Sequence, residues 1–338
     1  MSAGPREPVG VRPGPGPGPV AAWRPRPYSQ LLRGPTFRWW RPLLSILAGV
    51  GATLVLLLGL GVAYVVLQYA SGLDPLGGAS SGTSSGTASD AAEAWFTSPL
   101  GFLWSNLLLA AFVPLAMVAV WAGYGWRPRW VASVVPGIRW GWLLRCGLVS
   151  LVVIAVSVVG LELLDGYTWT PERDWVWLLV VVGLSTPLQA AGEEYLFRGW
   201  IPQLVGSMIP SAAVGALVGG LLSSTLFAIA HGQQNVWLFA DRFAFGAVAS
   251  WLVWRTGGLE AGIALHTTNN LVALVATIGS GDLRETVEIT DTTATYLVID
   301  LVTLAVAVAG ILLLARRRPV VRLFTPPLRP PPLDPYRG

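Results

Sequence analysis

The sequence predicts an all-α protein, a polytopic membrane bundle of about eight transmembrane helices. Two observations carry this prediction. Of the 338 residues, 53% are hydrophobic and only 12% are charged. The chain also contains several apolar stretches long enough to cross a hydrocarbon core, which requires roughly 20 helical residues. Because packed membrane helices form a single bundle more readily than separate domains, we expect one membrane domain over residues 43–318.

The apolar runs, read in chain order, place eight helices with short connections between most of them. The first is interpreted as a retained helix, because its apolar run is too long and the segment before it too extended for a cleavable signal peptide. The fourth and fifth are expected to form a hairpin, as are the sixth and seventh. The expected helices cover residues 43–68, 101–122, 143–164, 176–207, 212–231, 237–255, 259–279 and 295–315.

The segments outside the bundle are too rich in Pro, Arg, Gly or Ser to bury a core. Residues 1–42 and 319–338 are therefore expected to be disordered or extended tails. The stretch "GGASSGTSSGTASD" between the first two helices has the composition of a flexible linker.

The arginines predict the orientation of the bundle. Seven arginines precede the first helix, whereas residues 71–100 contain no basic residue. By the positive-inside rule, eight crossings then place both termini in the cytoplasm, and we expect the plasma membrane of a prokaryote. The net charge of +4 does not indicate a nucleic-acid partner, since the arginines cluster at membrane flanks and in the tails.

Two adjacent carboxylates and an arginine interrupt the fourth apolar run, in the stretch "AAGEEYLFRGW". Charge within a span costs several kcal/mol unless it is paired or hydrated. Glu194 and Arg198 are four residues apart, so they share a helix face and can form an ion pair. Glu193 points about 100° away, toward another polar feature of the bundle. The alternative is that both acids are solvated near the cytoplasmic end of the helix.

The chain contains only two histidines, and both lie in apolar helical context. Helical rise places Glu193 and His231 within about 7 Å of the same depth, measured from the turn near residues 207–210. His266 is expected some 12 Å from the turn near Gly257, which is shallower. Asn270 follows His266 by one helical turn. A shared polar pocket is allowed, although each histidine alone is more often a satisfied core residue.

Three short motifs occur in a fixed order: "EEYLFR", "FAIAH" and "HTTNN". They resemble the EExxxR, FxxxH and HxxxN motifs of the CAAX prenyl endopeptidase and bacteriocin-processing (CPBP) family of intramembrane proteases. The resemblance covers about residues 176–280. It implies a peptidase site in the membrane, with Glu193 and His231 activating a water, Glu194 and Arg198 holding the local architecture, and His266 and Asn270 completing the pocket.

The resemblance leaves the cofactor open between none and one divalent metal such as zinc. Two histidines and a glutamate can bind zinc with a water in the open position, and His231 and His266 would then be ligands. The chain has no HExxH helix to support such a site, so we expect chemistry without a metal.

The implied partners are membrane lipid and a peptide or protein substrate, lipidated substrates being one option. Two other functions stay open. Intramembrane Glu, His and Asp residues also build proton-coupled transporters. A non-catalytic family member would act as a scaffold or in immunity to a peptide or bacteriocin.

Overall fold

The structure is a computed structural model that describes residues 25–34, 37–70, 97–164, 166–171, 173–283 and 289–325. Nearly all of them belong to one compact unit, Arg26–Phe324. The second unit comprises residues 1–25 and 325–338 and is described only at Pro25 and Thr325. The expected linker between the first two helices and most of both expected tails lie outside the described residues.

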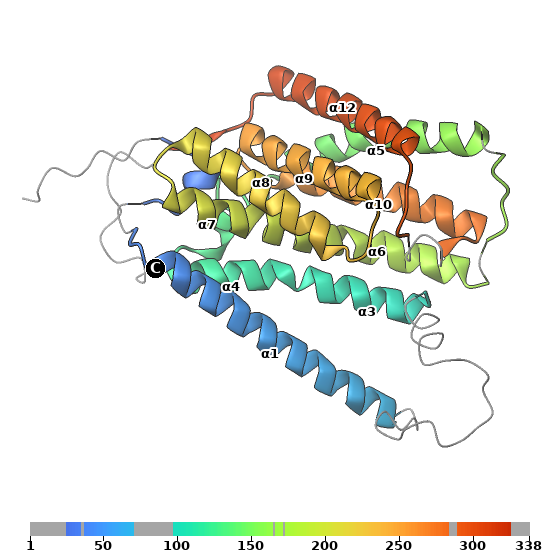
Figure 1. The fold of residues 1–338 in the computed structure, drawn as a ribbon, viewed down its shortest axis with the longest axis horizontal. Coiled ribbons are helices and arrows are strands. Elements are labelled where there is room, and N and C mark those ends of the chain that lie inside the picture. The colour runs from blue at the N-terminus through green and yellow to red at the C-terminus, as the bar shows by residue number, and fades with distance from the viewer. Residues whose placement is uncertain are drawn as a thin grey trace, which may run out of the picture. The chain divides into compact units, whose positions relative to one another are not determined.

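The unit is a helical bundle, and the described residues contain eight helical segments long and apolar enough to cross a membrane (Figure 1). The predicted fold class is therefore confirmed, and each expected helix lies within a few residues of an observed one. The helices are α1 (Arg41–Ala70), α3 (Pro99–Ala110), α4 (Phe112–Tyr124), α5 (Trp140–Leu164), α6 (Trp175–Glu194), α7 (Ile201–Met208), α8 (Ala212–Ala230), α9 (Val236–Thr256), α10 (Glu260–Ser280) and α12 (Ala294–Arg317).

The second expected helix, 101–122, is broken into α3 and α4 at Ala111. Pro114 explains the break. A proline inside a helix has no N–H to donate to the carbonyl four residues earlier, here that of Ala110, and its ring crowds that carbonyl. The two helices nevertheless form one apolar segment over Pro99–Tyr124.

The fourth expected helix, 176–207, is also not a continuous α-helix. A π-helical segment, η3 (Tyr195–Trp200), separates α6 from α7, and the Ile201 N–H bonds the Leu196 carbonyl five residues earlier. Pro202 has no N–H for the Arg198 carbonyl, which favours the change of hydrogen-bond pattern. π segments widen the helix by one residue per turn and often occur at functional sites.

The expected disordered tail over 1–42 is wrong for residues 26–34, which pack onto the bundle. The short strand β1 (Arg26–Pro27) pairs antiparallel with β2 (Leu323–Phe324). The 3₁₀ turn η1 (Tyr28–Gln30) follows β1, and Tyr28 is 1% exposed. Burial of an aromatic ring and the two leucines after it stabilises the segment. The pairing of β1 with β2 places both ends of the bundle on the same side, as an even number of crossings requires.

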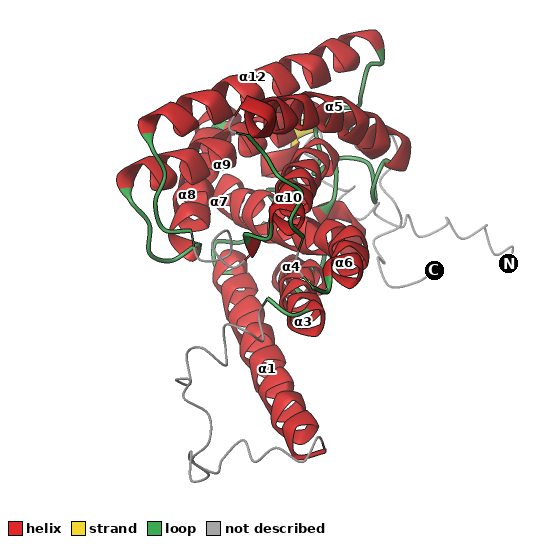
Figure 2. Cartoon of the chain, turned by 90° about the vertical axis from the view of Figure 1, so that its right-hand side faces the viewer, coloured by secondary structure: helices red, strands yellow, loops and turns green. Residues whose placement is uncertain are grey.

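Helix α10 is the centre of the unit. It packs against α5, α6 and α9, while α1 contacts chiefly α4 at one edge and α12 contacts α5 and α9 at another (Figure 2). One buried apolar cluster joins α5, α9, α10 and α12 around Leu252 and Ile311. A second joins α6 to the far end of α10 through Val182 and Ile278. The polar groups of α6 and α10 thus meet between two apolar layers.

Candidate active site

The two glutamates at the end of α6 differ in their surroundings. The side chain of Glu194 is fully buried, and its Oε1 lies 2.9 Å from Nη1 of Arg198, which is equally buried. This is the ion pair that the four-residue spacing predicts. The side chain of Glu193 is 11% exposed. The two adjacent carboxylates therefore occupy separate environments, one sealed and one at the edge of the protein interior.

His266, on α10, lies between the two carboxylates. Its Nδ1 is 3.0 Å from Oε1 of Glu194, and its Nε2 is 3.5 Å from Oε2 of Glu193. When Nδ1 donates to Glu194, the plane of the ring is fixed and Nε2 points at Glu193. The expectation that His266 is shallower than Glu193 is therefore wrong.

The expectation measured depth from two turns, one near residues 207–210 and one near Gly257, and assumed that both lie at the same depth in the membrane. They do not. A Cβ added at Gly199 would lie 3.5 Å from Leu259, just before α10. The turn before α10 is thus level with Gly199, and nine residues separate Gly199 from the end of α7 at Met208, a rise of roughly 13 Å. Glu194 and His266 are then about equally far from this level.

Gln189 extends the cluster by one turn of α6. Its Nε2 donates to Oε1 of Glu193 at 2.7 Å, and its Oε1 accepts from Nδ2 of Asn270 at 3.2 Å. Asn270 therefore belongs to the same hydrogen-bonded group as Glu193, through a residue that the motifs do not include. The signal for Gln189 was available, since it precedes Glu193 by four residues on the same helix face.

Aromatic rings close the cluster on the side of α8 and α9. The guanidinium of Arg198 lies 4.2 Å from the centroid of Phe227, a cation–π contact. Phe227 and Phe245 both meet the ring of His266 edge-on, with centroids 5.8 Å and 5.2 Å away. Phe245 is a further residue that the motifs do not contain.

His231 stands apart from the carboxylates. Its ring lies against Phe227, with centroids 4.7 Å apart, and its Nδ1 is 2.7 Å from the Phe227 carbonyl oxygen. Among the described residues, no hydrogen bond or ion pair joins His231 to Glu193. When Nδ1 donates to that carbonyl, Nε2 becomes the acceptor and faces away from the helix. The structure thus brings five of the six motif residues into one group, directly or through Gln189, and links the sixth through Phe227.

The residues do not fit a zinc site built on both histidines. In the described part of the chain, no three His, Cys, Asp or Glu side chains are arranged to hold a metal ion. His266 directs both ring nitrogens at carboxylates, whereas the ring of His231 lies against Phe227 and, among the described residues, has no hydrogen bond or ion pair with either carboxylate. We therefore derive no step through a metal.

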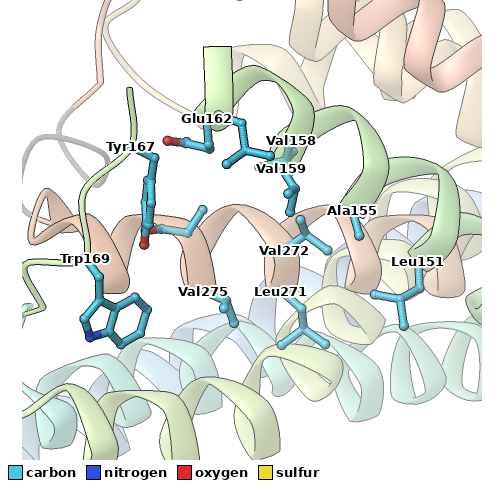
Figure 3. Close-up of a pocket in the computed structure, with 12 residues that line it drawn as sticks. Leu151, Ala155, Val158, Val159, Glu162, Tyr167, Trp169, Leu271, Val272 and Val275 are labelled. Carbon is cyan, nitrogen blue, oxygen red and sulfur yellow. The ribbon is translucent and has the colours of Figure 1, made fainter. Parts of the chain in front are cut away.

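An apolar cavity of about 420 Å³ lies between α5 and α10, but none of the motif residues lines it (Figure 3). Leu151, Val159 and Val275 contribute aliphatic side chains, and Glu162 and Tyr167 stand at one end. The cavity begins one residue past Asn270, at Leu271, on the face of α10 toward α5. The glutamate–histidine cluster is therefore not part of this cavity.

Comparisons with known proteins agree with the motifs. Residues 173–272 match the family described as type II CAAX prenyl endopeptidase Rce1-like. The uncharacterized protein YyaK of Bacillus subtilis (strain 168) is 26% identical over 193 residues, which cover 54% of this chain and 63% of that protein. The match thus spans less than two thirds of the relative's length. No solved structure matches the chain significantly. The matched residues 173–272 contain the entire glutamate–histidine cluster, so the similarity to the Rce1-like family of type II CAAX prenyl endopeptidases covers the candidate site.

Proposed function

We propose that the protein is an intramembrane endopeptidase that hydrolyses a peptide bond in a membrane-associated peptide or protein. The observation that carries the proposal is the state of Glu193. Its Oε1 is held by Gln189, and among the described residues no group donates a hydrogen bond to its Oε2. Nε2 of His266 lies 3.5 Å from this oxygen and carries no proton when the ring proton is on Nδ1, so Oε2 can accept a proton from water.

Glu193 is then the general base. It takes a proton from a water molecule as the water oxygen attacks the carbonyl carbon of the substrate, and it later gives that proton to the leaving amine. Glu193 thus takes up and returns the same proton, and this transfer needs no cofactor. His231, whose ring lies against Phe227, is assigned to orient the water through Nε2.

Asn270 is assigned to stabilise the oxyanion, the negatively charged oxygen that forms when water attacks the substrate carbonyl. Its amide has two N–H donors, and one is used by Gln189. The second is available to a carbonyl oxygen that gains negative charge during attack, and a fixed donor in a dry site stabilises such a charge strongly. His266 supports this arrangement by holding α10 against both carboxylates.

Glu194 and Arg198 are assigned to architecture and not to proton transfer. Both are fully buried, and they are paired with each other, so their charges neutralise one another where water does not reach. Arg198 also contacts Phe227, and His231 follows Phe227 by one helical turn. The pair therefore supports the helix ends that present the reacting groups.

The substrate class follows from the setting of the site and from the family. A carboxylate base within membrane-spanning helices selects peptides that reach the membrane, and a lipid-modified peptide is one member of this class. We place the protein in the plasma membrane of a prokaryote with both termini in the cytoplasm. No described feature favours a transporter, whose activity the experiment below separates from proteolysis.

Comparative peptide profiling tests the proposal. Membranes containing the wild-type protein and membranes containing Glu193→Gln at equal abundance are incubated, and new peptide termini are identified by mass spectrometry. We expect a small set of termini that appears only with the wild type. Identical sets of termini in both membranes would contradict the proposal, and proton flux without new termini would favour a transporter.

A further inference from the structure

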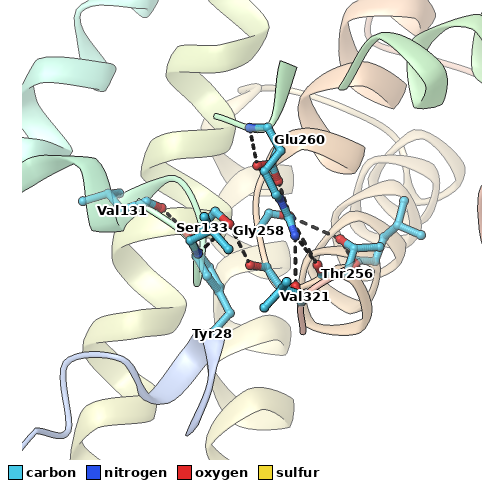
Figure 4. A network of polar contacts seen from close by, with 11 residues as sticks. Tyr28, Val131, Ser133, Thr256, Gly258, Glu260 and Val321 are labelled. Atoms are coloured by element: carbon cyan, nitrogen blue, oxygen red, sulfur yellow. Dashed lines mark hydrogen bonds and ion pairs between the residues drawn. The ribbon is translucent and has the colours of Figure 1, made fainter. Parts of the chain in front are cut away.

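A second ion pair lies outside the motifs, at the start of α10, with Glu260 fully buried and the Arg139 side chain 16% exposed. Arg139 binds both oxygens of Glu260, with Nε 2.8 Å from Oε1 and Nη2 2.6 Å from Oε2 (Figure 4). The backbone N–H of Arg139 donates to Oε1 as well, at 2.9 Å. Such a fork-to-fork contact fixes the relative orientation of the two groups, which a single point contact does not.

Glu260 is placed so that its position determines that of α10. It is the first residue of the helix and is fully buried. A carboxylate is favoured at a helix N-terminus, where the free N–H groups carry partial positive charge. Arg139 in turn directly precedes α5, and the N–H groups of Trp142 and Leu143 donate to its carbonyl oxygen. The pair thus joins the starts of the two helices that pack most closely in the bundle.

Arg139 also binds two further segments through the remaining N–H groups of its guanidinium. Nη1 donates to the carbonyl of Thr256, at the end of α9, and to that of Val321, just before β2, at 3.1 Å and 2.9 Å. The turn between α9 and α10 packs closely against this guanidinium. A Cβ at Gly258 would lie 2.6 Å from Nη2 of Arg139. One side chain therefore holds the end of α9, the start of α10 and the C-terminal segment.

The start of α10 is in direct contact with the catalytic cluster. Gly262, two residues after Glu260, packs so closely that an added Cβ would lie 2.6 Å from Oε2 of Glu194. His266 and Asn270 follow on the same rigid helix, about 9 Å and 15 Å from Glu260 along the axis. A shift or rotation of the first turn would therefore move His266 relative to both glutamates.

We propose that Arg139 and Glu260 form a positioning pair that fixes the depth and rotation of α10, and thereby holds His266 and Asn270 in register with Glu193 and Glu194. Neither residue touches the reacting groups. The effect of the pair on cleavage rests on the proposed function, whereas its effect on the position of His266 does not. The two consequences are measured separately.

The position of His266 can be read without any substrate, because the chain has only two histidines. Protein labelled with ¹⁵N-histidine gives ring signals from two imidazoles, and His231→Gln assigns them. In Arg139→Met/Glu260→Leu, we expect the ring signals of His266 to shift and broaden, because its contacts with the glutamates are no longer fixed. The His231 signals should stay close to their wild-type positions.

The double variant replaces both partners of the ion pair, so that the protein is expected to fold and the position of His266 can be measured. Apolar residues of similar volume often replace a buried ion pair without loss of stability, whereas removal of one partner leaves a buried charge. We therefore expect its melting temperature to stay near that of the wild type. Arg139→Lys keeps the charge but cannot make the two-point contact with the Glu260 carboxylate. We expect the His266 signals to shift less in this variant than in the double variant. Arg145→Met is the matched control, because Arg145 is exposed on α5 and outside the network.

The kinetic readout uses a peptide whose cleavage by the wild type has been established by mass spectrometry. Misplacement of a reacting group by about 1 Å can cost roughly 10²-fold in rate. We expect kcat of the double variant to fall by up to that factor with KM nearly unchanged, since substrate binding is not altered. Arg145→Met should match the wild type in both constants.

Unchanged His266 signals in a folded double variant would overturn the proposal. If the double variant does not fold, the Arg139→Lys variant is measured instead. His266 signals in Arg139→Lys that are identical to those of the wild type would then overturn the proposal. A shift of the His266 signals in a protein that cleaves no peptide would support the positioning pair and count against the proposed function alone.

Discussion

At the scale of single residues, the proposed mechanism depends on the difference between two neighbouring glutamates. Glu193→Gln keeps the shape of the side chain but removes the proton acceptor, so we predict a folded protein whose cleavage rate falls by at least about 10²-fold. Glu194→Gln leaves Arg198 without its carboxylate in a fully buried position, which costs roughly 3–5 kcal/mol. We therefore predict a lower melting temperature and a lower yield for Glu194→Gln.

The comparison requires a cleavage assay and a thermal melting curve in detergent on both variants. Equal melting temperatures for the two variants would show that Glu194 and Arg198 are not a structural pair. A Glu193→Gln protein that is unstable would place Glu193 in the architecture instead.

Gln189 provides a second prediction at this scale, because it binds Glu193 and Asn270 together. Gln189→Leu removes both hydrogen bonds, each worth about 1 kcal/mol. We predict that kcat falls roughly tenfold, which corresponds to about 1.4 kcal/mol. Gln203→Leu is the control, since Gln203 is a buried glutamine of α7 outside the site, and its Nε2 donates to the Trp130 carbonyl at 3.4 Å. Equal rates in the two variants would remove Gln189 from the site.

The sequence could predict contacts within one helix but not those between helices. The pair of Glu194 with Arg198 follows from a spacing of four residues, and the structure contains it. The contact of His266 with both glutamates could not be predicted, because it depends on the relative depth of two turns. The closeness of Gly199 to Leu259 shows this relative depth, and no local pattern in the sequence encodes it.

At the scale of helices, the close contact of α10 with α6 requires a glycine. In Gly262→Ala, the new methyl group would lie 2.6 Å from Oε2 of Glu194, so either this carboxylate must leave its contacts with Arg198 and His266 or the two helices must separate. We predict a loss of about 1–3 kcal/mol in stability, which is typical of overpacking, together with a fall in kcat. Thermal melting and the cleavage assay measure the two effects.

Gly147→Ala is the matched control on the facing helix α5. Its new Cβ would lie 4.0 Å from Cβ of Ala264, an ordinary contact, and alanine is favoured over glycine in a helix. We expect this variant to be as stable as the wild type or slightly more so. A Gly262→Ala protein that behaves in the same way would contradict the close packing of α10 on Glu194.

The existence of the helices could be predicted well, because long apolar runs have few other structures in a membrane. Their interruptions could be predicted less well. Pro114 and Pro202 are visible signals for the break at Ala111 and for the π segment, but other prolines are tolerated, as Pro187 is within α6. The packing of Tyr28 and the leucines after it was hidden in a segment whose composition indicates a tail.

At the scale of the whole molecule, the arginine distribution predicts the orientation in the membrane. We predict that a cysteine replacing Ser84 is labelled by an impermeant reagent in intact cells, in a protein whose native Cys146 is replaced by alanine. A cysteine replacing Ser211, between α7 and α8, should be labelled only after permeabilisation. The reverse pattern would show that the orientation is inverted.

The proposed function requires that this bundle hydrolyse a peptide bond with Glu193 as the base. The most direct test is cleavage of an identified peptide by purified protein in lipid vesicles prepared in ¹⁸O-labelled water. We predict that mass spectrometry finds one ¹⁸O atom in the newly formed carboxyl group, and that folded Glu193→Gln forms this product at least about 10²-fold more slowly. Cleavage at the wild-type rate by folded Glu193→Gln would contradict the account.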